Sequence, residues 1–140
     1  MKKYYLKTFE KKILADTLTP VSVYLKLRDH YSNTLLLESS DYHANDNSFS
    51  YICFNPIANI KVQKNQIIET FPDGSISTTQ IDETISIPKK INDYINKFKT
   101  STNNHKFINN GLFGYISYDS VKFFESVKSN KSLNSLDIPE

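Results

Sequence analysis

The sequence has 140 residues, 39% of them hydrophobic and 13% aromatic, which suffices for one domain with a modest core. Its 17 Lys and Arg residues nearly balance 15 Asp and Glu residues, and the basic residues are scattered, which argues against a nucleic-acid footprint. The basic N-terminus has no apolar stretch behind it, and no apolar run reaches about 20 residues, so we expect neither a signal peptide nor a membrane span.

The first elements can be predicted from local signals. Residues 3–10 mix aromatic and basic side chains, which predicts a short first strand. Thr19 and Pro20 then predict the start of a helix, because a hydroxyl N-cap precedes a proline at the first helical position. The helix would present one apolar face, formed by residues at helical spacing: Val23, Tyr24, Leu27 and Tyr31.

Two apolar runs separated by a polar loop come next. Residues 34–37 predict a buried strand, residues 39–48 a loop, and residues 49–54 a second strand. The second strand holds the single cysteine, Cys53, whose apolar neighbours favour a buried thiol over a nucleophile. A chain with one cysteine forms no internal disulfide, which suits a reducing cytoplasm.

The middle of the chain predicts an antiparallel meander. Three runs at 58–63, 66–71 and 75–81 have strand character, and the short segments between them carry turn residues. The second connection is Pro72-Asp73-Gly74, in which proline presets one φ angle and glycine accepts a positive one.

The last third predicts a second helix and a final strand. Pro88 would open the helix, whose apolar positions follow the i, i+3, i+4, i+7 pattern: Ile91, Tyr94, Ile95 and Phe98. Residues 111–119 form an apolar run with two glycines, which predicts a strand approached closely by another backbone or a ligand, and a short helix would span 120–127. The fold class is therefore α+β, with antiparallel, sandwich-like sheets and two to three helices.

Residue patterns alone predict no catalytic equipment. The three histidines, at 30, 43 and 105, are too far apart to suggest a zinc site, and no glycine-rich phosphate loop is present. Asp41 and Asp46 flank a loop, where solvated carboxylates are a better interpretation than a cation site. No carboxylate pair is placed for acid–base chemistry by a motif.

Three segments in order resemble the N-terminal domain of anthranilate synthase component I. They are Ala-Asp-Thr-Leu-Thr-Pro-Val-Ser-Val-Tyr at 15–24, Leu-Leu-Leu-Glu-Ser-Ser at 35–40 and Gly-Leu-Phe-Gly-Tyr-Ile-Ser-Tyr-Asp at 111–119. Phe49-Ser50 and Asn55-Pro56, between the last two segments, are similar to further elements of the family. Two departures stand out, because Ser48 replaces the usual arginine and Asn110 the first glycine of a pair.

The resemblance implies a parent enzyme of tryptophan biosynthesis, a lyase that converts chorismate and ammonia into anthranilate and pyruvate with Mg²⁺. A glutamine amidotransferase subunit, component II, would supply the ammonia. In this family the chorismate-binding catalytic domain lies C-terminal to the region seen here. Residues 1–140 are therefore expected to be a truncated, catalytically inactive N-terminal domain with no catalytic or metal-binding residues of its own.

The resemblance also implies feedback inhibition by L-tryptophan. The family places this effector against the Leu-Leu-Glu-Ser strand, which indicates Glu38, Ser39, Ser40 and Phe49 as binding residues, with further residues contributed by the catalytic domain. A zwitterionic amino acid with an indole ring needs charge, hydrogen-bond donors and an apolar wall, and these residue types provide them.

Three alternatives stay open at this point. Aminodeoxychorismate synthase component I shares this N-terminal architecture, although the clear Thr-Pro-Val-Ser and Leu-Glu-Ser elements favour anthranilate synthase. A free-standing interaction module is a second alternative, with the apolar run at 112–118 as its contact surface. From pattern alone, a Glu-Ser pair after three leucines is also typical of a strand that ends in solvent.

Overall fold

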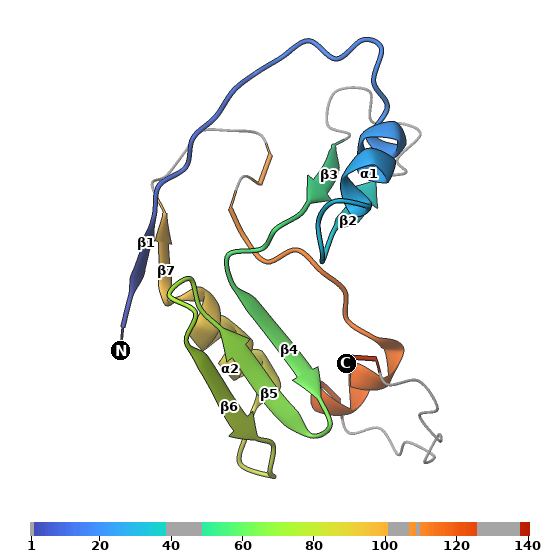
Figure 1. Cartoon of the computed structure of the whole chain (residues 1–140). Helices are drawn as coiled ribbons and strands as arrows, with labels where there is room; N and C mark the ends of the chain where they lie inside the picture. The colour runs from blue at the N-terminus through green and yellow to red at the C-terminus, as the bar shows by residue number, and fades with distance from the viewer. Residues whose placement is uncertain (1, 39–48, 101–106, 109, 126–137) are drawn as a thin grey trace. The chain divides into compact units, whose positions relative to one another are not determined.

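The computed structural model describes residues 2–38, 49–100, 107, 108, 110–125 and 138–140 (Figure 1). The chain divides into two compact units. Unit 1 comprises Met1–Tyr5, Ile57–Lys99 and Tyr115–Glu140, and unit 2 comprises Leu6–Pro56 and Thr100–Gly114. Helices and small antiparallel sheets occur together, which confirms the predicted α+β class. Among the described residues, no helix is long and apolar enough to cross a membrane.

Unit 1 is built on the predicted meander. Strands β4 (Asn59–Gln63), β5 (Gln66–Thr70) and β6 (Ile76–Gln80) form an antiparallel sheet in the order β4-β5-β6. Lys64 and Asn65 join the first two strands with φ angles of 51° and 60°. Positive φ at both central residues is what a type I′ hairpin turn requires, so this connection matches the twist of the strands.

The second hairpin turn uses the predicted glycine. Gly74 has a φ of 78°, and its N–H donates to the carbonyl of Phe71 at 2.9 Å. The N–H of Phe71 donates in turn to the carbonyl of Ser75 at 3.0 Å. A side chain at position 74 would be strained in this left-handed conformation, which explains the glycine.

The core of unit 1 lies between this sheet and helix α2 (Ile87–Ile95). Burial alternates along β5, so that Ile67 and Glu69 are buried while their neighbours are half-exposed. The cluster consists of three buried residues and the partly buried residues packed on them: Val62, Ile67, Ile87, Ile60, Ile81, Ile85, Ile91 and Phe123. The sheet and α2 thus bury one continuous apolar layer.

Helix α2 ends earlier than its apolar pattern predicts. Its C-cap is Asn96, so Phe98 lies in β7 (Phe98–Thr100), which pairs with β1 (Tyr4–Leu6). Tyr94 is fully buried, and its hydroxyl donates to the carbonyl of Thr70 at 2.8 Å. Burial, with the nearby charge of Glu69, raises the pKa of Tyr94 to about 12. The predicted apolar face is therefore only partly confirmed, because Ile95 is exposed.

A buried ion pair lies just after the C-terminal end of α2. Lys97 Nζ lies 2.8 Å from Glu69 Oε1, and only 16% of the Lys97 side chain and 8% of the Glu69 side chain are exposed. The same ammonium lies 4.6 Å from the ring centroid of Phe71 and 5.7 Å from that of Tyr94. Carboxylate and aromatic faces together replace the water that this charge loses on burial.

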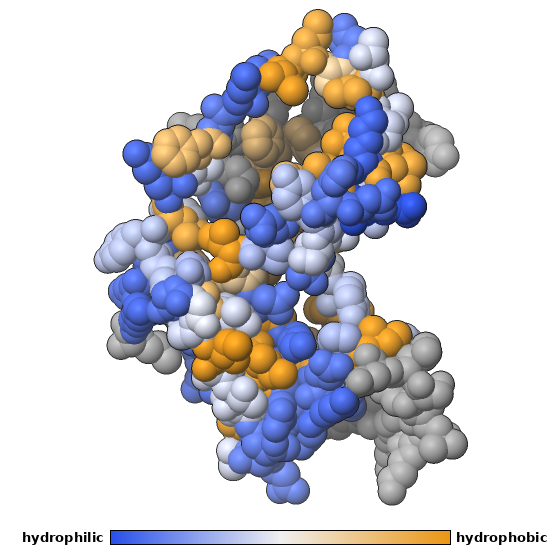
Figure 2. Space-filling view, viewed as in Figure 1, coloured by the Kyte–Doolittle hydropathy of each residue, from blue (hydrophilic) through white to orange (hydrophobic). Residues whose placement is uncertain are grey.

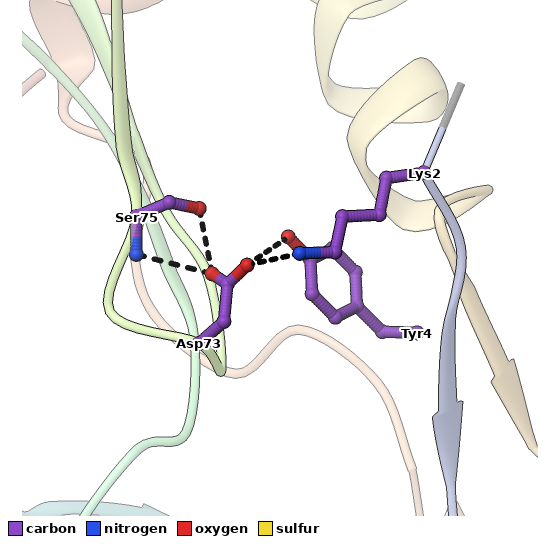
Figure 3. Close-up of polar contacts among 4 residues, drawn as sticks. All are labelled: Lys2, Tyr4, Asp73 and Ser75. Carbon is purple, nitrogen blue, oxygen red and sulfur yellow. Dashed lines mark hydrogen bonds and ion pairs between the residues drawn. The ribbon is translucent and has the colours of Figure 1, made fainter.

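Asp73 holds the N-terminal strand to the second hairpin turn (Figure 3). Lys2 Nζ and the Tyr4 hydroxyl both donate to its Oδ2, and Ser75 donates to Oδ1 through its N–H at 3.0 Å and its hydroxyl at 2.6 Å. The hydrogen bond from Lys2, followed by those from Ser75, lowers the pKa of Asp73 well below its usual range.

Acid should therefore weaken this attachment. A carboxyl whose pKa is lower in the folded chain than in the unfolded chain stabilises the fold above its ordinary pKa of about 4, and this stabilisation is lost as the pH falls below that value. We expect Asp73→Asn to melt below the wild type near neutral pH, with the gap closing below about pH 4. Thermal melts across the acid range would check this, and a gap independent of pH would contradict it.

Unit 2 contains helix α1 (Pro20–Arg28) and the antiparallel pair β2 (Leu35–Glu38) and β3 (Ser50–Cys53). The predicted cap of α1 is confirmed: the side chain of Thr19 accepts from the Ser22 N–H, and Ser22 Oγ accepts from the Thr19 N–H, both at 3.1 Å. This reciprocal capping box satisfies two backbone donors at the start of the helix.

Apolar side chains remain on the surface of unit 2. Figure 2 shows hydrophobic residues on the visible surface of the part that carries α1, β2 and β3. Phe9 is 81% exposed and Leu14 is 85% exposed, and both lie in a stretch without regular secondary structure. All the deeply buried residues that the structure describes belong to unit 1, so the described part of unit 2 is less well packed than that of unit 1.

The strand predicted at 111–119 is wrong. Residues 111–117 form no strand, and a 3₁₀ helix, η1 (Tyr118–Phe123), follows in place of the helix predicted at 120–127. Tyr118 is 91% exposed, and Tyr115 and Ile116 are also exposed. Two glycines weaken strand propensity here, and apolar composition alone does not provide a neighbouring strand to pair with.

Candidate functional site

The β2/β3 pair brings two of the predicted effector-binding residues to one end of a hairpin. Its register pairs Leu36 with Ile52 and Glu38 with Ser50. Glu38 is the last residue of β2, and Phe49 directly precedes β3, so the two lie at the same end of the ladder. Predicted site residues Ser39 and Ser40 lie outside the described residues, as does the loop predicted at 39–48.

The ladder also fixes which faces the side chains occupy. Residues paired across an antiparallel ladder share a face, and successive residues alternate. Glu38 and Ser50 therefore share one face, whereas Leu37 and Tyr51 share the other. Glu38 is exposed, so its carboxylate is accessible at the strand end.

Aromatic side chains from residues 107–113 meet the β3 segment. The ring centroid of Phe49 lies 5.9 Å from that of Phe107, and Tyr51 lies 5.3 Å from Phe113. The N–H of Ile108 donates to the Tyr51 hydroxyl at 3.2 Å. Phe49 is thus one member of an aromatic layer formed by residues of the β3 segment and of the segment 107–113.

The two glycines of the 111–119 segment are not forced by close packing. A Cβ at Gly111 would make an ordinary contact of 3.5 Å with Ile108, and one at Gly114 would meet nothing within 4 Å. Neither position shows the close approach of another backbone that a strand glycine predicts.

Other candidate chemistries find little support. Burial raises the pKa of the Cys53 thiol, which disfavours the thiolate and supports a structural thiol. In the described part of the chain, no group of three His, Cys, Asp or Glu residues could hold a metal ion. His43, His105, Asp41 and Asp46 lie outside that part.

Sequence comparison relates the chain to three curated proteins, each named anthranilate synthase component 1. The identity is 32% over 123 residues with the protein of Lactococcus lactis subsp. lactis (strain IL1403), 30% over 118 residues with that of Aquifex aeolicus (strain VF5), and 31% over 123 residues with that of Acinetobacter calcoaceticus. The chain belongs to the anthranilate synthase component 1 family. These matches cover 83–84% of the chain but only 23–24% of the relatives, so the chain spans about a quarter of their length. No family model and no solved structure matches.

Within this anthranilate synthase component 1 family member, the segments that carry the resemblance have visible structural roles. The first contains the capping box of α1, and residues 35–38 of the second form β2. Asn110, which stands where the family usually has glycine, donates from its side-chain amide to Thr8 Oγ1 at 2.8 Å. Ser48, the other departure, lies outside the described residues.

Sequence reasoning missed part of the aromatic layer in this chain. Tyr51 carried a signal, because it lies two residues after Phe49 and strand periodicity places such positions on one face. Phe107 and Phe113 carried none, because both lie far from β3 in the sequence. Such contacts depend on the path of the chain and not on local pattern.

Proposed function

We propose that this chain is the N-terminal regulatory domain of an anthranilate synthase and that it binds L-tryptophan as a feedback inhibitor through Glu38, Ser39, Ser40 and Phe49. The family relationship supports the enzyme, and the position of Glu38 and Phe49 at the same end of the β2/β3 ladder, where a ligand could reach both, supports the site. The complete enzyme would be a cytoplasmic lyase of tryptophan biosynthesis. It would convert chorismate and ammonia into anthranilate and pyruvate.

The same proposal assigns catalysis and ammonia supply to other parts of the enzyme. A chorismate-binding domain, C-terminal to this region, would carry the catalytic residues, and Mg²⁺ would assist there. A glutamine amidotransferase, component II, would supply ammonia. The metal would be held by that catalytic domain, and we propose no metal ligand in this chain. The chain by itself would be catalytically inactive.

The residue chemistry suits a zwitterionic aromatic ligand. The exposed Glu38 carboxylate could accept hydrogen bonds from the ammonium group of tryptophan, and such charge-assisted bonds contribute about 1.5–3 kcal/mol each. Phe49 and its aromatic neighbour Phe107 offer a wall on which an indole ring could pack. The hydroxyls of Ser39 and Ser40 would add donors for the ligand carboxylate.

Binding alone would not inhibit the enzyme. An effector shifts a conformational equilibrium only by the difference between its affinities for the two states. Tryptophan would therefore have to bind more tightly to an inactive arrangement of the regulatory and catalytic domains than to the active one. The family resemblance implies that the pocket also includes residues of the catalytic domain, so the isolated chain should bind tryptophan weakly.

Replacing Glu38 with glutamine in the complete enzyme should release feedback inhibition without slowing the uninhibited reaction. Loss of a charge-assisted hydrogen bond should raise the tryptophan concentration for half-inhibition about tenfold or more. Anthranilate formation, followed by its fluorescence over a tryptophan series with component II present, would measure this shift.

Glu83→Gln provides a matched control, because Glu83 is an exposed carboxylate in unit 1, between β6 and α2. It should leave the inhibition curve unchanged. If the wild type were inhibited by tryptophan and Glu38→Gln were inhibited equally, the site assignment would be wrong, whereas the enzyme assignment would stand on the product formed.

The two other functions make different predictions. Aminodeoxychorismate synthase component I would yield aminodeoxychorismate in place of anthranilate, so product identification separates it, and the names of the three relatives favour anthranilate. A free-standing interaction module is favoured by one observation, the exposure of Tyr115, Ile116 and Tyr118. The reading frame beyond residue 140 discriminates here, because chorismate-domain sequence there would support either enzyme, whereas a stop codon would support the module.

A further inference from the structure

Residues 138–140 make several directed contacts within unit 1. The N–H of Glu140 donates to the carbonyl of Val62 in β4 at 2.7 Å. The main-chain oxygen of Glu140 accepts from the Ser117 N–H at 3.3 Å and from Ser120 Oγ at 2.9 Å. Its side-chain Oε1 lies 2.7 Å from Lys122 Nζ. Glu140 therefore connects β4 with η1 and with Ser117, the residue that precedes η1. Figure 1 shows the C-terminus of the chain beside β4 and η1.

The contact with β4 is made on the side of the strand that faces away from β5. Among the described residues, β4 is an edge strand that pairs with β5. Gln63 and Gln66 flank the two-residue turn, and the closing pair of such a hairpin is the hydrogen-bonded one, so alternate residues of β4 direct their backbone groups toward β5. Val62, one residue away, directs its carbonyl outward, which is where Glu140 binds.

The contacts with η1 are partly shielded from water. Ser120 is only 3% exposed, and its hydroxyl lies between Glu140 and Ser117 Oγ, the latter at 3.1 Å. The Tyr115 hydroxyl donates to the carbonyl of Pro139 at 3.2 Å, which adds a further point of attachment. Phe123, at the end of η1, packs on the core cluster. Residues 138–140 thus connect a core-contacting helix to the sheet edge.

We propose that residues 138–140 act as a latch that binds the edge of β4 facing away from β5 and holds η1 against the three-stranded sheet. An open edge strand presents backbone groups that can pair with another chain, and native proteins usually cover or blunt such edges. The occupant of this edge is a segment of the same chain, seated by one backbone hydrogen bond to β4 and anchored by the contacts with η1. The inference is independent of the proposed effector site, which lies in unit 2.

Amide hydrogen exchange in the whole chain, followed by NMR, tests the latch. Glu140→Pro removes the N–H that binds Val62, and Ser120→Ala removes the hydroxyl that binds the other side of Glu140. Loss of one hydrogen bond of ordinary net strength changes a local opening equilibrium roughly two- to tenfold. We expect this acceleration in both variants at the amides of Ser117 and Phe124, while amides of β5 keep their rates.

Two outcomes would overturn the proposal. Unchanged exchange at Ser117 and Phe124 in both variants would show that the contacts do not hold η1. Equal acceleration throughout β5 would show that they contribute to the general stability of unit 1 and not to a separable latch. The wild type provides a third test, because protection of β4 amides that rises with protein concentration would make a second copy of the chain the occupant of this edge.

Discussion

Replacing Ile67 with alanine should lower the free energy of unfolding of unit 1 by about 2–5 kcal/mol. Ile67 is 1% exposed and lies at the centre of the cluster between β5 and α2. Truncation removes apolar atoms from a site packed on several sides, and the surrounding strands and helix can close the cavity only in part. The cost therefore includes both lost transfer free energy and the cavity.

Ile68 offers a control of identical chemistry. It is the next residue of β5, on the opposite face of the sheet, and is only half-buried. Ile68→Ala should cost clearly less than Ile67→Ala, since less apolar surface is returned to water. Because the chain has two compact units, the comparison should use a probe confined to unit 1, such as denaturant-dependent exchange of the β5 amides. Equal losses for both variants would contradict the described core.

Replacing Lys97 with methionine should cost about 3–5 kcal/mol, because it leaves the buried Glu69 carboxylate without its partner. The two side chains are 16% and 8% exposed, so water cannot readily replace the lost ammonium. Methionine keeps much of the apolar length that packs beside Phe71 and Tyr94, so the loss reports mainly on charge. Unfolding of unit 1 in urea, followed by the β5 amides, would measure it.

A double variant separates the pair from its surroundings. In Glu69→Leu combined with Lys97→Met, no buried charge remains, and stability should return to within about 1–2 kcal/mol of the wild type or exceed it. Arg28→Met provides the exposed counterpart in unit 2, because the Arg28–Asp29 pair at 3.5 Å is solvent-exposed and should contribute less than about 1 kcal/mol to the stability of that unit, followed there by the α1 amides. A Lys97→Met loss as small as that of Arg28→Met would contradict the buried pair.

Local signals in the sequence were sufficient for much of the fold. The Thr19 cap and Gly74 turn were predictable because each depends on a few adjacent residues with particular conformational preferences. The three-stranded meander was predictable because its strands are short, apolar and separated by such turns. These features require no knowledge of distant contacts.

The parts that were missed depend on tertiary contacts. Residues 111–119 have the composition of a strand, but composition does not provide a pairing partner. Nothing local indicated that Glu69 would be buried against Lys97, since the two are 28 residues apart and meet only when α2 packs on the sheet. The apolar pattern of α2 likewise extended to Phe98, although the helix ends before it.

The candidate site was predictable to a similar extent. The β2 and β3 strands followed from their apolar runs, and their pairing places Glu38 beside the start of β3. The opposite faces of Glu38 and Tyr51 could be assigned only once the register was known, because a shift of one residue exchanges the faces. Roles for Ser39 and Ser40 stay predictions, since both lie outside the described residues.

Unit 2 carries the proposed sensing hairpin, yet the deeply buried residues described here all belong to unit 1. The described part of unit 2 has few deeply buried side chains, and regions with few buried contacts have low local stability and lose conformational entropy when a ligand orders them. Low local stability at the proposed site would weaken its apparent affinity for tryptophan, through the entropy cost of ordering the β2/β3 pair. Inhibition of the enzyme would then begin only after tryptophan has accumulated.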